Sequence, residues 1–110
     1  MTKLRVFQDA VRLVALMRVL WERAGRHSKR TRAQMESAAT STPANIAEGA
    51  HRSGGHQRER FGAAMGSARE CIAHCEIAIA AGYLTGPECE DAIDLADKIA
   101  ATLWRCLHPR

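Results

Sequence analysis

The chain of 110 residues has few aromatic residues, few β-branched residues and no long hydrophobic run. Aromatic residues make up only 5%, which disfavours proteins that bind single-stranded nucleic acid by stacking its bases. The most apolar stretch, residues 4–20, is interrupted by Arg5, Asp9, Arg12 and Arg18, so it predicts neither a membrane span nor a signal peptide. Scarce β-branched residues and abundant alanine instead favour an all-helical fold.

The sequence also lacks the short motifs that mark many enzymes. It contains no Gly-rich phosphate loop, no nucleophile elbow, no HExxH and no paired CxxC motif. Its four cysteines, Cys71, Cys75, Cys89 and Cys106, lack the spacing of a secreted disulfide scaffold. We expect them to be reduced and buried on apolar helix faces. These absences predict a cytoplasmic, non-enzymatic protein that holds no cofactor and no metal.

The positive charge of the chain is concentrated in its first half. The length fits one domain, residues 1–110, which can bury a core without a metal or a disulfide. The net charge is +4, yet residues 1–60 carry +7 and residues 61–110 carry −3, and arginine outnumbers lysine 13 to 3. A basic half is expected to meet an anionic partner such as RNA or DNA or, alternatively, the acidic half of a neighbouring copy.

The hydrophobic pattern predicts four helices separated by short breaks. They run from about Lys3 to Ala24, from an N-cap at Thr31 to about Ala50, from about His56 to Ala81, and onward from Thr85-Gly86-Pro87-Glu88. Gly82 is the expected cap at the end of the third helix. Pro43 predicts a kink or break near residues 39–42. Four helices with short connections predict an antiparallel up-down four-helix bundle.

Each predicted helix has apolar residues at helical spacing, which we expect to form the core. These positions are Leu4, Phe7, Val11, Val14, Met17 and Trp21 in the first helix, widened by Leu13, Leu16 and Leu20; Met35, Ala38, Ala39, Thr42, Ile46 and Ala47 in the second; Phe61, Ala64, Ala68, Cys71, Cys75 and Ala78 in the third; and Cys89, Ala92, Ile93, Ala96, Ile99, Leu103 and Cys106 in the fourth. The wide stripe of the first helix predicts contacts on more than one side.

The segment Ser41-Thr42-Pro43-Ala44-Asn45-Ile46-Ala47-Glu48-Gly49 resembles the S-x-P-x-N-I-A-E-G signature of a bacterial four-helix-bundle family, also known as the 23S rRNA intervening-sequence proteins. Gly66-Ser67-Ala68 with Glu70 resembles the G-S-x-x-E of that family's third helix, and Gly82-Tyr83-Leu84 resembles its G-Y-L end. The resemblance covers nearly the whole chain, although Thr42 stands where the family usually has an apolar residue. It implies a bundle that assembles into a ring-shaped homopentamer.

The resemblance also bears on partners. The family is similar in fold to the accessory variability proteins of diversity-generating retroelements, which are basic pentamers that partner a reverse transcriptase and RNA. No biochemical activity is established for most of the family. The resemblance therefore implies a homo-oligomeric scaffold or adaptor whose partner is structured RNA or DNA, a ribonucleoprotein or, in the alternative interpretation, an unidentified protein alone.

Two interpretations of the signature remain open. Asn45 and Glu48 share a helix face and could form a ligand or catalytic site. One carboxylate and one amide lack a nucleophile or a second acid, which favours a structural role. In that role the polar face is hydrogen-bonded or lies at a subunit contact, and Ser41 or Asn45 supplies a partner for the carbonyl that Pro43 frees near Ala39.

Two groups of basic residues are candidates for nucleic-acid binding. The first basic cluster comprises Arg23, Arg26, Lys29, Arg30 and Arg32, with His27 among them, and the second basic cluster comprises Arg52, Arg58 and Arg60. Guanidinium groups bind phosphate oxygens bidentately, whereas the alternative is an ordinary solvated surface. Neither cluster has interleaved aromatic residues, so binding is expected to follow the backbone and shape of the nucleic acid rather than its sequence.

A metal site is the least favoured alternative. Cys71, His74 and Cys75 are three metal-binding residue types at i, i+3 and i+4, and Cys106 or His108 would have to complete a tetrahedral zinc site. We favour instead two small core cysteines and a histidine at the boundary of the core.

A cluster of acidic residues opens the fourth predicted helix. In those first turns carboxylates complement the helix dipole, and in a ring they could also face the basic half of a neighbouring copy. The residues are Glu88, Glu90, Asp91 and Asp94.

Overall fold

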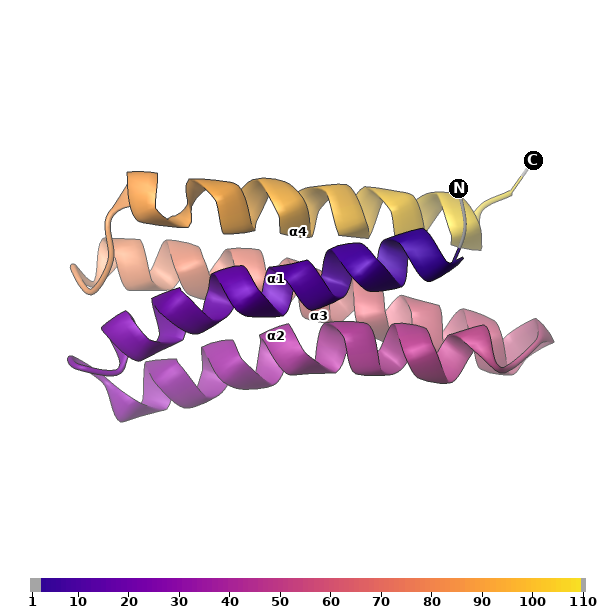
Figure 1. Ribbon diagram of the computed structural model, residues 1–110, viewed down its shortest axis with the longest axis horizontal. Coiled ribbons are helices and arrows are strands. Elements are labelled where there is room, and N and C mark those ends of the chain that lie inside the picture. Colours follow the sequence, from indigo (N-terminus) through magenta and orange to yellow (C-terminus); the bar gives the residue numbers. More distant parts are fainter. Residues whose placement is uncertain (1–2, 110) are drawn as a thin grey trace.

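The computed structural model describes residues 3–109, which form four helices. These are α1 (Lys3–Ala24), α2 (Lys29–Ala50), α3 (Gly54–Ala80) and α4 (Gly86–Leu107). Consecutive helices run antiparallel in an elongated bundle of 42 × 21 × 18 Å (Figure 1). Helices α1 and α3 each pack against both α2 and α4. The predicted all-α four-helix bundle is confirmed. No helix among the described residues is long and apolar enough to cross a membrane.

Side-chain caps determine where α2 and α4 begin. The fourth helix begins where predicted, and of the two candidate caps, Thr85 and Gly86, it is Thr85 that caps α4, in a capping box with Glu88, while Pro87 occupies the first turn. The prediction for α2 is wrong by three residues, because Ser28 is the N-cap and accepts a 3.0 Å hydrogen bond from the Thr31 amide. Helix α3 likewise begins at Gly54, two residues before the predicted start.

Helix α2 continues without a break through Pro43, so of the two predicted outcomes, a kink or a break, the break is wrong. Polar side chains around the proline bond to nearby carbonyls. Ser41 and Thr42 donate to the Ala38 carbonyl at 3.2 and 2.9 Å, and Asn45 Nδ2 donates to the Ser41 carbonyl at 2.9 Å. The polar residues of the signature therefore bond to their own helix, at the carbonyls of Ala38 and Ser41 rather than at the predicted one near Ala39.

The core side of α1 differs from the prediction. Helix α1 is apolar around much of its circumference, so the spacing of apolar residues did not identify the buried side. Leu4 and Val11 were expected in the core but are 64% and 48% exposed. Four predicted positions are buried, Leu13, Met17, Leu20 and Trp21, and Val6, Ala10 and Ala24 are buried although they were not predicted. The other predicted positions, Phe7, Val14 and Leu16, are half-buried.

The other three helices follow their predicted core faces more closely. Every core position predicted in α3 is buried, and in α2 only Ala47 is half-buried. In α4, Leu95 and Leu107 are buried, whereas Ile93 is half-buried and Cys106 is exposed. The expectation that all four cysteines are buried is therefore wrong for Cys106, which lies one position before the buried end of the helix.

Candidate nucleic-acid interface and the family signature

The two basic clusters lie at opposite ends of the bundle. The first surrounds the turn between α1 and α2, and the second surrounds the turn between α2 and α3 (Figure 1). Helix α2 separates these turns, and its 22 residues span about 33 Å. A single chain therefore does not present the predicted basic residues as one continuous surface.

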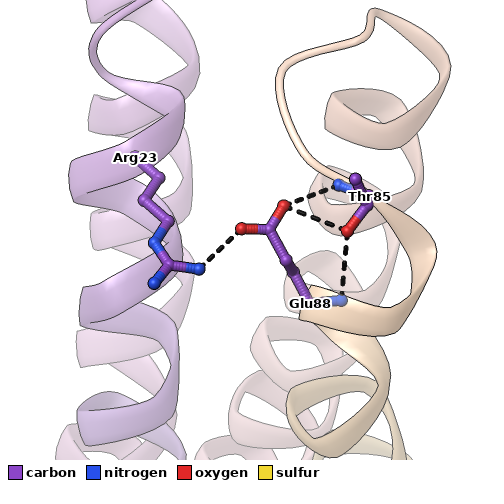
Figure 2. Close-up of polar contacts among 3 residues, drawn as sticks. All are labelled: Arg23, Thr85 and Glu88. Carbon is purple, nitrogen blue, oxygen red and sulfur yellow. Dashed lines mark hydrogen bonds and ion pairs between the residues drawn. The ribbon is translucent and has the colours of Figure 1, made fainter.

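Arg23 differs from the rest of the first basic cluster because it is paired within the chain. Its Nη1 lies 2.6 Å from Oε2 of Glu88, so the pair joins α1 to α4 (Figure 2). The other carboxylate oxygen of Glu88 accepts a 2.9 Å hydrogen bond from the Thr85 amide. The Thr85 hydrogen bonds, the amide bond first among them, together with Arg23 lower the pKa of Glu88. The charge of Arg23 is thus partly neutralised by Glu88 of the same chain.

The other four members of the first basic cluster are exposed, and their positive charge is not neutralised in this way. These residues are Arg26, Lys29, Arg30 and Arg32. Their side chains form no hydrogen bond or ion pair with another residue in the described range 3–109. They leave this end of the bundle able to attract an anionic partner.

The second basic cluster is engaged in contacts within the chain. Arg52 Nη2 lies 2.8 Å from Glu48 Oε1. Arg58 Nη1 donates to the Leu107 carbonyl at 2.8 Å, where it satisfies a carbonyl at the end of α4. Arg60 Nη1 donates to Asn45 Oδ1 at 3.4 Å and so connects α3 to the signature. Arg58 and Arg60 thus join helices at their end of the bundle, whereas Arg52 pairs with a residue at the end of the preceding helix, α2.

The signature and the G-S-x-x-E motif meet between α2 and α3. Ser41 Oγ and Ser67 Oγ are 2.6 Å apart and form a hydrogen bond. Gly49 lies against α3 so closely that a Cβ there would be 2.7 Å from Cδ1 of Phe61. Ile46 is fully buried between these contacts. This part of the signature therefore supports the packing of α2 on α3.

The remaining motif residues do not form a site of their own. Asn45 bonds to the Ser41 carbonyl and to Arg60, whereas Glu48 is exposed and paired with Arg52. In the G-S-x-x-E motif, Gly66 and Glu70 face solvent. Asn45 and Glu48 thus contact different partners and do not form one site.

Cys71 and Cys75 are core residues. Both are 1% exposed, and Cys75 Sγ lies 3.8 Å from Met17 Sδ. Burial raises the pKa of Cys71 to about 12 and raises that of Cys75 further, so both thiols stay protonated at neutral pH. No three His, Cys, Asp or Glu residues between positions 3 and 109 are arranged to hold a metal ion. The alternative metal site at Cys71, His74 and Cys75 therefore lacks geometric support.

Tyr83 is a neighbour of the first basic cluster that the sequence pattern did not indicate. Its ring stacks on His27, with ring centroids 5.4 Å apart and an interplanar angle of 6°. The first basic cluster has no interleaved aromatic residue in the sequence, but the fold places the Tyr83 ring beside it. The predicted antiparallel order of the helices could have indicated this neighbour, because it places the end of the third helix at the same end of the bundle as the end of the first.

Comparison with known protein families identifies one match over nearly the whole chain. The family model described as 23S rRNA-intervening sequence protein matches residues 2–105. No curated protein and no solved structure is significantly similar to the chain. The match includes both motifs that meet between α2 and α3. The chain belongs to the 23S rRNA-intervening sequence protein family.

Proposed function

We propose that the protein is a non-enzymatic, homo-oligomeric scaffold or adaptor that binds structured RNA, free or in a ribonucleoprotein, through the first basic cluster. The observation that carries the proposal is a group of exposed cations at one end of the bundle that pair with no other residue of the described range 3–109, namely Arg26, Lys29, Arg30 and Arg32. Arginine is well suited to phosphate because its planar donors match two oxygens at once.

The outer face of α1 supports the homo-oligomeric part of the proposal. Leu4, Val11 and Val19 are 64%, 48% and 48% exposed, and their spacing places them on one side of the helix. The opposite side of α1 is buried in the bundle. A helix with apolar residues on both sides is expected to be covered on both, and a second copy of the chain would cover the outer one. A ring would also present several copies of the first basic cluster to one RNA.

A salt-dependent binding measurement tests the RNA proposal. A labelled RNA hairpin and a labelled DNA duplex are titrated with the protein at several salt concentrations, and fluorescence anisotropy reports binding. We expect the logarithm of the affinity for the hairpin to fall linearly with the logarithm of salt. In an Arg30→Glu/Arg32→Glu variant the affinity should fall, and the slope should shrink by about 1 for each phosphate that the variant no longer neutralises.

The control reverses two exposed arginines outside both clusters and away from the outer face of α1, Arg69 midway along α3 and Arg105 near the end of α4. The resulting variant, Arg69→Glu/Arg105→Glu, matches the charge change of the test variant. Equal decreases in affinity in the two double variants would contradict a site at the first basic cluster. Absence of binding at low salt would contradict RNA binding altogether and favour the protein-only platform, and tighter binding to the duplex would make DNA the partner.

A further inference from the structure

An open cavity lies beside the first basic cluster, at the end of the bundle where the α1–α2 and α3–α4 turns meet. Its volume is about 470 Å³, which is within the range of about 300–1,000 Å³ typical of ligand pockets. The lining combines polar, charged and apolar side chains from three segments of the chain. They include Arg30, Thr31, Gln34, His74, Ile77 and Tyr83.

Tyr83 is held in a fixed position at the edge of this cavity. Its amide donates to the Ala78 carbonyl at 2.9 Å, and the amide of Gly82 donates to Ile79 at 3.0 Å. With Gly82 at a φ of +81°, this is the hydrogen-bond pattern of a Schellman motif. His27 stacks on the Tyr83 ring from the opposite turn. The ring is therefore positioned before any ligand arrives, which lowers the entropic cost of binding to it.

The charges around the cavity favour phosphate. Arg30 lines it without an ion pair, and no carboxylate is among its lining residues in the described part of the chain. Three other cavities on the bundle surface mix carboxylates with cations: Asp91 and Asp94 lie beside Arg12 and Lys98 in one, Asp97 lies beside Arg69 and Arg105 in another, and Asp9 lies beside Arg5, Lys98 and Arg105 in a third. A phosphate at those places would meet charges of both signs, whereas here it would meet a guanidinium with no carboxylate among the described lining residues.

We propose that this cavity binds one unpaired nucleotide of the RNA, with its base against the Tyr83 ring and its phosphate at Arg30. The proposal rests on the RNA binding proposed above and specifies which part of the RNA is recognised. Every base has a π face, so stacking on Tyr83 tolerates any sequence, and Gln34 can hydrogen-bond to a base edge. The protein therefore prefers RNA that carries a loop or bulge over a continuous duplex, because paired bases cannot enter the cavity.

The test uses two labelled RNA hairpins with the same stem and the same number of phosphates. One has a loop of unpaired uridines, and the other has abasic sites at those positions. We expect the intact protein to bind the uridine loop about tenfold more tightly than the abasic loop. Tyr83→Leu should remove that preference without changing the affinity for the abasic loop or its salt slope. Tyr83→Phe, which keeps the ring, should retain the preference, and Arg30→Gln should weaken binding to both hairpins.

Trp104→Leu is the matched control. Trp104 is 47% exposed and stacks on His108 with ring centroids 4.1 Å apart, at the other end of the bundle. Thermal unfolding confirms that each variant is folded. Equal affinity of the unmodified protein for the two hairpins, or equal effects of Tyr83→Leu and Trp104→Leu, would overturn the nucleotide site while leaving salt-dependent RNA binding in place. Failure to bind either hairpin at low salt would overturn both proposals.

Discussion

The size of a single residue, Gly49, determines how closely α2 and α3 approach at one end of the bundle. A Cβ built on it would lie 2.7 and 2.8 Å from two ring atoms of Phe61 and 3.0 Å from Cβ of Arg60. Phe61 is 3% exposed and has little space into which it can move. Gly66 is also inside a helix, yet a Cβ there would meet nothing within 4 Å. The two motif glycines therefore differ in physical role.

We expect Gly49→Ala to lower the free energy of unfolding by about 1–3 kcal/mol, because the new methyl group forces the Phe61 ring out of its packing. Gly66→Ala serves as the control and should raise that free energy by up to about 1 kcal/mol, since alanine favours the helix over glycine. Urea unfolding followed by circular dichroism measures both changes. If Gly49→Ala proves as stable as Gly66→Ala, the close approach of α2 and α3 does not require glycine.

At the scale of the helices, Glu88 links the start of α4 to the end of α1. Its carboxylate accepts hydrogen bonds from Thr85 and forms the ion pair with Arg23 (Figure 2). Farther along the same pair of helices, Lys98 Nζ lies 3.6 Å from Asp9 Oδ2. Asp9 is 8% exposed, so this second ion pair keeps a charge compensated at the edge of the core. Two ion pairs, at different positions along the helices, thus connect α1 to α4.

The ionisation of Glu88 should make the stability of the protein depend on pH in the acidic range. Its pKa is lower in the folded protein than the ordinary value of 4.5, so it contributes stability above that pH, and this stability disappears as pH falls through the folded pKa. Glu88→Gln should weaken that acid dependence in unfolding curves recorded from neutral pH downward. Thr85→Ala should cost about 1 kcal/mol at neutral pH through removal of the cap.

Glu90→Gln is the control for this measurement, because Glu90 is exposed two residues farther along α4. It removes the same kind of charge without touching Arg23 or Thr85. The interhelical role of Glu88 would be excluded if Glu88→Gln and Glu90→Gln gave the same dependence on pH.

The sequence predicts helix ends and core faces well only where the signal is local or unambiguous. Thr85, Pro87 and Glu88 mark the start of α4 because the cap, the proline and the capping-box acid are within four residues of one another. At α2, Ser28 and Thr31 are both competent caps, and the sequence alone does not choose between them. In α1 the surplus of apolar residues hid the buried side. The contacts that α1 makes with α2 and α4, rather than periodicity, select it.

At the scale of the whole molecule, the candidate site was likewise predictable only where the signal lies in the sequence itself and not in contacts made by the fold. Arginine excess and charge asymmetry were enough to find both basic clusters. They did not reveal that the second cluster is bonded within the protomer or that Arg23 is paired with Glu88, because such partners are up to 65 residues apart in the chain. Tyr83 was missed for the same reason. The fold makes the two ends of the bundle chemically different, with free cations and an aromatic ring at one of them.

Association of several copies of the chain through α1 can be tested by measuring the mass of the assembly. If copies of the chain associate through the exposed apolar residues of α1, light scattering should report a multiple of the 12.1 kDa mass of one chain, and the family resemblance implies that this multiple is five. Val11→Arg places a charge in that apolar surface and should shift the mass toward the monomer. Ala63→Arg adds the same side chain at an exposed position on α3, diagonally across the bundle, and should leave the mass unchanged. A monomeric protein at micromolar concentration, or equal dissociation by the two variants, would contradict association through α1.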